Sequence, residues 1–216
     1  MPSALPLLAV FASGRGSNFG ALAEAARRGE LGGEIRVLLC DQPGAPVLDR
    51  ARRLGIEALT PPTGRFRTRL EDESPWVDAL RARGVGTVVL AGFMRRLHAG
   101  FLDAFPNRTL NIHPSLLPAF PGLDAIGQAW RAGVRVTGCT VHLVTDALDA
   151  GPILSQRAVE IGDDEPFESL EERMHAAEHA RYPATVRRFL TEPGHVEDGR
   201  YVWTSPVGAP RAGGPR

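Results

Sequence analysis

Apolar runs with the length of buried strands alternate along the first half of the chain with segments whose apolar positions recur at helical spacing. Strands are expected at residues 5–12, 35–40, 56–59, 87–91 and 108–112, and helices at residues 18–28, 46–54, 76–83 and 97–105. This alternation predicts right-handed crossovers and a mostly parallel, doubly wound sheet, an α/β fold of the Rossmann-like kind with helices on both faces.

The pattern changes after Gly122. A helix expected at 124–132 is followed by strands at 135–144 and 153–161 with only a loop between them, which predicts an antiparallel addition to the sheet near its C-terminal end. In the long amphipathic segment at 166–190, Pro183 predicts a kink or the start of a new helix. We expect a single domain over 1–190. Residues 191–216 then form a hairpin around Asp198 and Gly199 and a disordered tail at 208–216.

The charge composition narrows the range of partners and reactions. The 25 basic and 25 acidic residues give a formal net charge of zero, and no basic block points to nucleic acid or an anionic membrane. All 25 basic residues are arginine. The absence of lysine excludes a Schiff-base lysine, a lysine general base and the lysine of a Walker phosphate loop. Small neutral or anionic molecules remain as ligands.

The cysteines and the apolar start of the chain favour a cytoplasmic protein. Cys40 and Cys139 stand in apolar, strand-like surroundings without metal-ligand spacing, so we expect buried free thiols. The opening LPLLAVFA has no basic segment before it and runs straight into a glycine-rich turn, as a first buried strand does. No apolar run has the length of a membrane span.

The stretch SGRGSNFG at residues 13–20 directly follows the first expected strand. Its glycines permit a tight turn and Ser17 or Asn18 can cap the next helix, so the turn can present backbone N–H groups and a helix dipole to an anion. A dinucleotide is the main competitor, with Asp41 as a ribose ligand, although Phe19 stands where the fingerprint has its third glycine. From the residues alone, a structural turn, a phosphate site and a dinucleotide site all remain open.

The stretch NIHPSLLPAFPG at residues 111–122 places a histidine between a strand and a proline-rich loop. Asn111 and His113 project from one face of an extended strand, and Asp149, in the later stretch VHLVTDALDAGPIL, can approach the same cleft. An amide, an imidazole and a carboxylate suit attack on a carbonyl carbon, because donors hold the oxyanion and the carboxylate orients the imidazole. The alternative is a capped strand end in which Asp149 stabilises its own turn.

Metal binding is the weaker interpretation of the other histidines. His142 faces an undetermined side of its strand, and His175 with His179 lies on one face of an expected helix without a third ligand. We therefore expect no metal site.

Several stretches, in order along the chain, carry a resemblance to a known family. They are SGRGSN after the first strand, VVLAGFMRRL at 88–97, NIHPSLLPAFPG at 111–122, VTGCTVHLVTDALDAGPIL at 136–154 and EHARYP at 178–183. From about residue 6 to 190 the chain resembles the phosphoribosylglycinamide formyltransferases, folate-dependent enzymes of purine synthesis. The NIHPSLLP motif marks the wider family that uses 10-formyltetrahydrofolate, whereas the phosphate turn marks this member.

The resemblance implies a role for each matching residue. It implies catalytic roles for Asn111, His113 and Asp149; a phosphate loop at Gly16, Ser17 and Asn18; a ribose or glycinamide contact at Glu178; and a folate pocket at Met94, Arg95, Leu97, Val144, Thr145 and Asp146. The N-terminal half then serves the nucleotide and the C-terminal half the folate. The implied cosubstrate, 10-formyltetrahydrofolate, is consumed, and no tightly bound cofactor is implied. No role passes to Asp124.

Other functions of related chemistry differ in what they require. A formyltetrahydrofolate hydrolase uses the same three residues on water and is expected to carry an additional amino-terminal regulatory domain. A formyltransferase for initiator tRNA needs a basic carboxy-terminal domain. A nonenzymatic nucleotide-binding module explains SGRGSN but leaves the amide, imidazole and carboxylate without a purpose. Either a monomer or a homodimer is compatible with the sequence.

Overall fold

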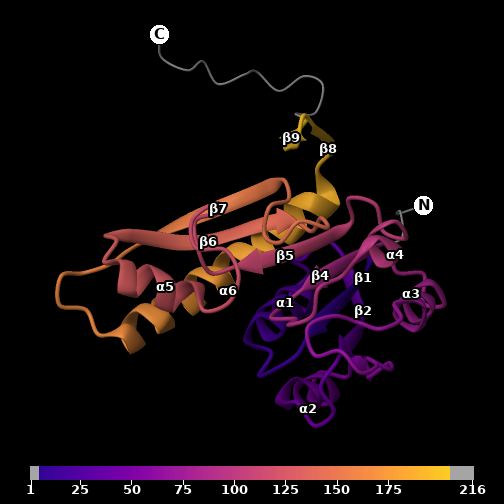
Figure 1. Ribbon diagram of the computed structural model, residues 1–216. Helices are drawn as coiled ribbons and strands as arrows, with labels where there is room; N and C mark the ends of the chain where they lie inside the picture. Colours follow the sequence, from indigo (N-terminus) through magenta and orange to yellow (C-terminus); the bar gives the residue numbers. More distant parts are fainter. Residues whose placement is uncertain (1–4, 205–216) are drawn as a thin grey trace.

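The computed structural model describes residues 5–204 of the chain. Its seven main strands are β1 (Leu7–Ala12), β2 (Glu34–Cys40), β3 (Glu57–Leu59), β4 (Thr87–Leu90), β5 (Thr109–His113), β6 (Val136–Leu143) and β7 (Ile153–Glu160). They form one sheet in the order β3-β2-β1-β4-β5-β6-β7 (Figure 1). Neighbours from β3 to β5 are parallel, whereas β6 is antiparallel to both β5 and β7. The predicted doubly wound sheet with an antiparallel addition is confirmed.

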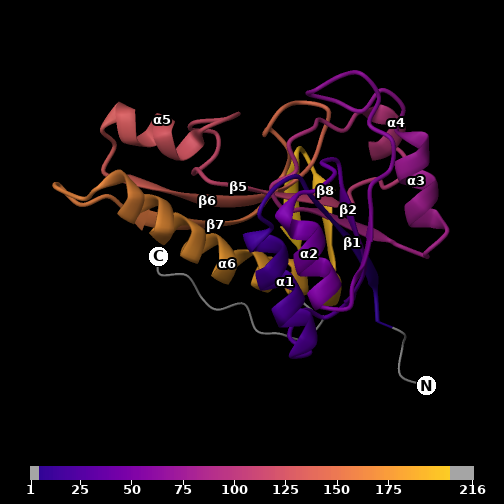
Figure 2. The same ribbon diagram turned by 90° about the horizontal axis from the view of Figure 1, so that it is seen from below.

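Helices cover both faces of this sheet. They are α1 (Ser17–Arg27), α2 (Pro46–Arg53), α3 (Ser74–Arg81), α4 (Ala99–Leu102), α5 (Ala125–Ala132) and α6 (Phe167–Thr191). Figure 2 shows α1, α2 and α6 below the strands, with α3 and α4 on the other side. Among the described residues, none of the helices combines the length and apolar character that a bilayer crossing requires.

Alternation along the strands divides the core into two clusters. In β1, Val10 packs into the cluster beneath α1 and α6, whereas Phe11 packs into the cluster under α3 and α4. The Phe11 ring lies 5.2 Å from the Trp76 ring and 5.5 Å from the Phe101 ring. A parallel sheet buried on both faces accounts for the continuous apolar runs in the sequence.

The same alternation in β5 positions polar side chains. Leu110 and Ile112 belong to the cluster beneath α6, so Asn111 and His113 project to the opposite face. The hydroxyl of fully buried Tyr182 in α6 donates to the Leu90 carbonyl at 2.7 Å and lies 3.2 Å from the Leu110 carbonyl. The long helix is therefore joined to the two central strands whose ends form the site described below.

Two expectations about helices require correction. Residues 167–191 form one continuous helix through Pro183, so no new helix starts there. Proline removes one backbone donor, and burial of Tyr182, Val186 and Phe189 on the core side outweighs that loss. The helix expected at 97–105 is only four residues long: it starts after His98, which is extended and whose N–H Glu73 accepts, and it ends in turns in which Ala104 and Phe105 donate to carbonyls three residues earlier.

The remaining local expectations are largely met. The hairpin consists of β8 (Gly194–Glu197) and β9 (Arg200–Trp203), with Asp198 and Gly199 at positive φ in a two-residue turn. The tail expected at 208–216 lies outside the described residues. Cys40 and Cys139 are buried free thiols, as predicted, and burial raises the pKa of Cys139 to about 11.

Candidate active site

A cavity of about 680 Å³ opens where several strands end. Its wall is formed by the turn after β1, the loop after β4, the end of β5 with the proline loop that follows, and the connection between β6 and β7. Ligands of doubly wound folds bind outside the carboxyl ends of the strands. The cavity is thus in the position that the topology favours.

The turn after β1 places a helix N-terminus at the cavity. Gly16 precedes α1 with a left-handed φ of 71°, and an added Cβ would collide with Val47. The first N–H groups of α1, at Ser17 and Asn18, have no acceptor within the helix. Backbone donors and the positive helix end therefore face the cavity, as an anion site requires.

The structure weakens the dinucleotide interpretation at both positions that bear on it, Phe19 and Asp41. Phe19, at the position of the missing third glycine, is fully buried in the core cluster. The carboxylate of Asp41 accepts from the Arg95 guanidinium at 2.8 Å, and both side chains are buried. Since this carboxylate is committed to an ion pair, a phosphate group is the better ligand for the turn.

Asn18 and Glu178 meet although they are distant in sequence. Asn18 Nδ2 donates to Glu178 Oε2 at 3.1 Å, and both residues line the cavity. Glu178 is 4% exposed, and burial raises the pKa of its carboxyl group to about 7, against the opposing effect of the Asn18 hydrogen bond. The acid implied by the resemblance thus lies beside the phosphate turn and titrates close to neutral pH.

Asn111 and His142 form the first polar pair at the middle of the cavity. Asn111 is opposite His142 in the antiparallel register of β5 and β6, and Asn111 Nδ2 lies 3.2 Å from His142 Nε2. His142 Nδ1 is 2.9 Å from the Leu143 carbonyl, which can only accept, so Nδ1 carries the hydrogen and Nε2 accepts from the amide. Burial lowers the pKa of His142, in keeping with a neutral ring.

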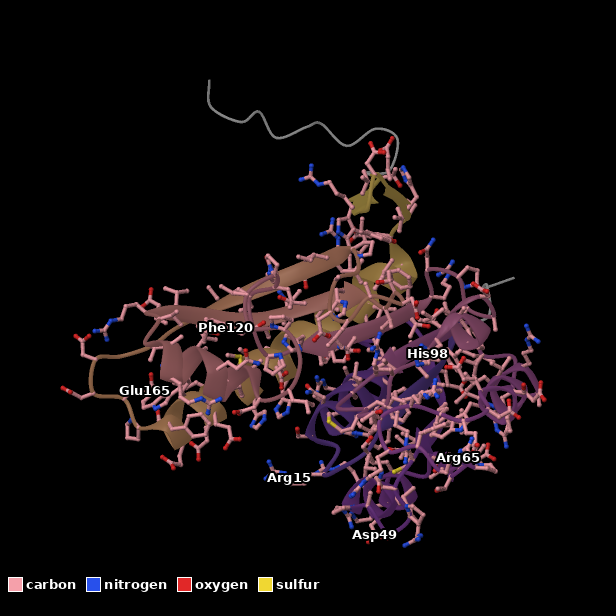
Figure 3. The ribbon with its side chains drawn as sticks, in the orientation of Figure 1. Arg15, Asp49, Arg65, His98, Phe120 and Glu165 are labelled. Atoms are coloured by element: carbon pink, nitrogen blue, oxygen red, sulfur yellow. The ribbon has the colours of Figure 1, made fainter. Side chains whose placement is uncertain are left out.

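His113 lies between two oxygen acceptors. His113 Nε2 is 2.8 Å from the carbonyl of Phe120, which Figure 3 labels, and Nδ1 is 3.5 Å from Asp149 Oδ2. The same Asp149 oxygen accepts from the Gly122 N–H at 2.8 Å. The structure therefore brings the predicted imidazole and carboxylate together, with the proline loop holding both.

The proline loop is itself anchored to β6 and β7. The Thr140 hydroxyl donates to the Ser115 carbonyl at 2.7 Å and accepts from the Leu117 N–H at 3.1 Å. Gln156 Nε2 donates to the Leu117 carbonyl at 2.9 Å. These contacts position the segment that supplies the Phe120 carbonyl and the Gly122 N–H.

Five of the six residues expected to bind folate lie in the wall of the cavity. Met94, Arg95, Leu97, Val144 and Thr145 line the cavity.

Asp146 does not line the cavity. Its side chain is 75% exposed, because its carboxylate turns to His98 Nδ1 at 3.3 Å. Asp124, to which no role passed, pairs with Arg131 at 2.7 Å.

Two residues important to the geometry, His142 and Ser13, have no role in the site predicted from the sequence. The sequence offers His142 only as a metal ligand. The Ser13 hydroxyl, which accepts from the Met94 N–H at 2.9 Å, joins the turn after β1 to the loop after β4. The alternation of β6 relative to β5 is the signal that identifies His142 once the pairing register is known.

The fold and the cavity define an α/β enzyme of the group-transfer class. The chain belongs to the formyl transferase family, whose model matches residues 7–186. It is 41% identical over 182 residues to the phosphoribosylglycinamide formyltransferase of Bacillus subtilis, covering 84% of this chain and 93% of that protein. It is 38% identical to the human trifunctional purine biosynthetic protein adenosine-3, covering 91% of this chain and 20% of that protein.

Solved structures agree with this assignment. Glycinamide ribonucleotide transformylase 1 from Symbiobacterium toebii matches with a TM-score of 0.88 and 40% identity, over 95% of this chain and 96% of that chain. The agreement extends over nearly the whole length of both chains.

Proposed function

We propose that this protein transfers the formyl group of 10-formyltetrahydrofolate to the amine of 5′-phosphoribosylglycinamide, giving formylglycinamide ribonucleotide and tetrahydrofolate. One observation carries the proposal: an amide, an imidazole and a carboxylate share a single cavity with a helix N-terminus suited to phosphate. The close relation to proteins named for this reaction supports the choice of substrates.

The reaction begins when the glycinamide amine attacks the formyl carbon and negative charge develops on the formyl oxygen. Asn111 donates one amide hydrogen to neutral His142, which leaves its second amide hydrogen for that oxygen. His142 acts as a positioning residue, because the hydrogen bond to its ring fixes the direction in which the NH₂ group of Asn111 points. The donation strengthens as the oxyanion forms and thus favours the transition state.

His113 and Asp149 stabilise the oxyanion and assist proton transfer. A protonated His113 donates to the oxyanion, and the Phe120 carbonyl holds its Nε2, so Nδ1 is the nitrogen available to the reaction. The 3.5 Å separation from Asp149 is longer than a strong hydrogen bond. The carboxylate can therefore assist transfer of a proton from the attacking amine to the leaving N10, through a water molecule.

The remaining cavity residues bind and orient the two substrates. Gly16, Ser17 and Asn18 receive the phosphate, and Glu178 contacts the ribose or glycinamide portion. Met94, Arg95, Leu97, Val144 and Thr145 form the folate wall. Holding both substrates in this way makes a bimolecular reaction effectively unimolecular. Asp146 has no side-chain role in this proposal.

The proposal also covers the cellular compartment, the partners and the oligomeric state. The enzyme works in the cytoplasm on small molecules, without nucleic acid, as a monomer or homodimer. Light scattering on the eluate of a sizing column distinguishes these two assemblies, and a larger assembly contradicts both.

A paired assay tests the reaction. Purified protein is given 10-formyltetrahydrofolate with and without phosphoribosylglycinamide, and both tetrahydrofolate release and the formylated product are measured. Release that requires the amine, with formylglycinamide ribonucleotide formed, is the expected result. Equal release in both samples with free formate means a hydrolase, and no release from folded protein favours a binding module.

Substitutions in the same assay test the assigned residues. His113→Ala and Asp149→Asn are expected to lower turnover about 10²- to 10⁴-fold while nucleotide affinity changes little. His195→Ala, on the exposed part of the hairpin, is the matched control and should retain turnover. Near-normal turnover in both cavity variants would rule out this assignment of residues.

A further inference from the structure

The connection between β6 and β7 is held at Asp146 by two residues of the loop after β4. The Arg96 guanidinium donates to the Asp146 carbonyl at 2.9 Å, and Asp146 Oδ1 lies 3.3 Å from Nδ1 of His98, which Figure 3 labels. Because a carboxylate can only accept, His98 Nδ1 carries the hydrogen of its contact. These two contacts together are called the Asp146 clasp.

The two clasp side chains stand on a backbone that is fixed to the core. Glu73 Oε1 accepts from the His98 N–H and Glu73 Oε2 from the Phe101 N–H, at 2.7 Å each. Phe101 is fully buried in the cluster under α3 and α4. The Arg96 N–H donates to the Thr68 carbonyl at 2.9 Å. The clasp therefore joins the connection between β6 and β7 to a segment that is itself anchored.

The connection has few other supports. At its start, the Val144 N–H donates to the Thr109 carbonyl at 2.8 Å. In the part of the chain that the structure describes, residues 145–150 form hydrogen bonds with other segments at two places. One is the clasp, and the other is Asp149 Oδ2, which accepts from the Gly122 N–H at 2.8 Å. The clasp is thus one of two supports for the segment that carries the carboxylate of the site.

The backbone of Asp149 depends on such support. Asp149 has a φ of 48°, in the left-handed region that residues with a side chain rarely adopt. A conformation of this kind persists only where the surrounding contacts hold it. The carboxylate lies 3.5 Å from His113 Nδ1 and 3.8 Å from His142 Nε2. A shift of the connection at Asp146, three residues earlier, would therefore move the carboxylate relative to both rings.

We infer that His98 and Arg96 are positioning residues for formyl transfer, because they hold the connection where Asp149 lies beside His113. The inference rests on the proposed function, in which Asp149 assists proton transfer. The side chains of His98 and Asp146 are 36% and 75% exposed, and exposed ion pairs add little to folding stability. A small displacement of a reacting group, in contrast, lowers a rate strongly. The clasp should therefore affect turnover more than stability.

Replacements of His98 test the clasp. His98→Phe keeps a ring of similar size without a donor, whereas His98→Asn keeps a donor close to the position of Nδ1. An exposed ion pair contributes about 1.4- to 5-fold, so His98→Phe should lower kcat about two- to fivefold and leave KM for the nucleotide unchanged. His98→Asn should recover most of the lost turnover. Arg96→Met removes the second contact, and its combination with His98→Phe should lower kcat about tenfold.

A double-mutant cycle identifies the partner of His98. Asp146→Ala removes the acceptor of the His98 contact and leaves the backbone carbonyl for Arg96. Its effect on kcat should equal that of His98→Phe, and the two together should cost no more than either alone. Arg135 and Asp163 are the matched control, an exposed pair at 2.7 Å that does not line the cavity. Arg135→Leu and Asp163→Ala should leave kcat unchanged.

Amide exchange reports the position of Asp149 without any turnover. The Gly122 N–H donates to Asp149 Oδ2, so its exchange with deuterium, followed by NMR, is slow while the carboxylate is in place. In His98→Phe and in Asp146→Ala this amide should exchange about two- to fivefold faster than in the unsubstituted protein. In His98→Asn its rate should be close to that of the unsubstituted protein.

The outcomes separate this inference from the proposed reaction. Normal kcat in His98→Phe, with formylglycinamide ribonucleotide formed, overturns the clasp and leaves the reaction standing. Equal losses in His98→Phe and His98→Asn assign the effect to the shape of the ring and also overturn it. If the unsubstituted protein transfers no formyl group, the proposed function fails. Unchanged Gly122 exchange in Asp146→Ala then overturns the clasp independently of any turnover.

Discussion

The carboxyl group of Glu178 makes the folding stability of this protein depend on pH in a calculable way. It is buried in α6 and accepts one hydrogen bond, from Asn18. Burial disfavours the charged form and raises its pKa from the usual 4.5 to about 7, and the Asn18 bond opposes this only in part. Glutamine at this position keeps an oxygen for the Asn18 amide but carries no charge at any pH.

The sign follows from proton linkage. The folded state holds its proton up to about pH 7, whereas an unfolded glutamate releases it near 4.5, so the native state binds more protons between these values. The contribution of Glu178 to the free energy of unfolding is fully present below about pH 4.5 and is lost as the pH rises to about 7. At 1.36 kcal/mol per pH unit, the loss is at most about 3 kcal/mol.

Urea unfolding of the ligand-free protein measures this effect. The Glu178→Gln variant should gain up to about 3 kcal/mol over the unsubstituted protein when the two are compared at pH 8 rather than pH 4.5. Glu172→Gln, at an exposed position of the same helix, is the matched control and should show no pH-dependent difference. A constant difference between Glu178→Gln and the unsubstituted protein across this range would refute the reasoning.

Three further substitutions probe other contacts. Gly16→Leu forces a side chain against Val47 at a φ of 71°, so it should cost about 1–3 kcal/mol and weaken nucleotide binding; unchanged affinity in calorimetry argues against the phosphate turn. Tyr182→Phe removes the buried donor between two strands and should cost about 1–3 kcal/mol in urea unfolding. Asp41→Ala leaves the buried cation of Arg95 unpaired and should cost about 3–5 kcal/mol, and equal stability would contradict the buried pair.

The parts of the site that follow from local pattern could be predicted from the sequence. The alternation of β5 puts Asn111 and His113 on one face, because successive side chains of a strand point to opposite sides. The turn before α1 is also local, since Gly16 and the helix start are adjacent in the chain. These features depend on spacing of a few residues, and the sequence contains that spacing directly.

The parts that depend on register between distant segments could not be predicted in this way. His142 lies opposite Asn111 only because β6 pairs antiparallel to β5 in one particular register, and a shift by one residue would turn its ring to the other face. The pairing of Arg95 with Asp41 likewise requires the ends of β4 and β2 to approach. Both contacts are set by the packing of the whole sheet, so no single stretch of sequence indicates them.

The two histidines at the cavity differ in task because their neighbours differ in hydrogen-bonding capacity. His142 has a carbonyl at Nδ1 and an amide donor at Nε2, which together are satisfied only by a neutral ring. His113 has an oxygen near each ring nitrogen: the Phe120 carbonyl lies 2.8 Å from Nε2, and Asp149 Oδ2 lies 3.5 Å from Nδ1. In the proposed reaction, His142 orients the Asn111 amide as a neutral ring, whereas His113, beside the Asp149 carboxylate, donates to the oxyanion. Two of these neighbours, the Leu143 and Phe120 carbonyls, are backbone groups of β6 and the proline loop, and the other two, the Asn111 amide and the Asp149 carboxylate, are side chains that the packing of β5, β6 and the loop after β6 brings to the rings.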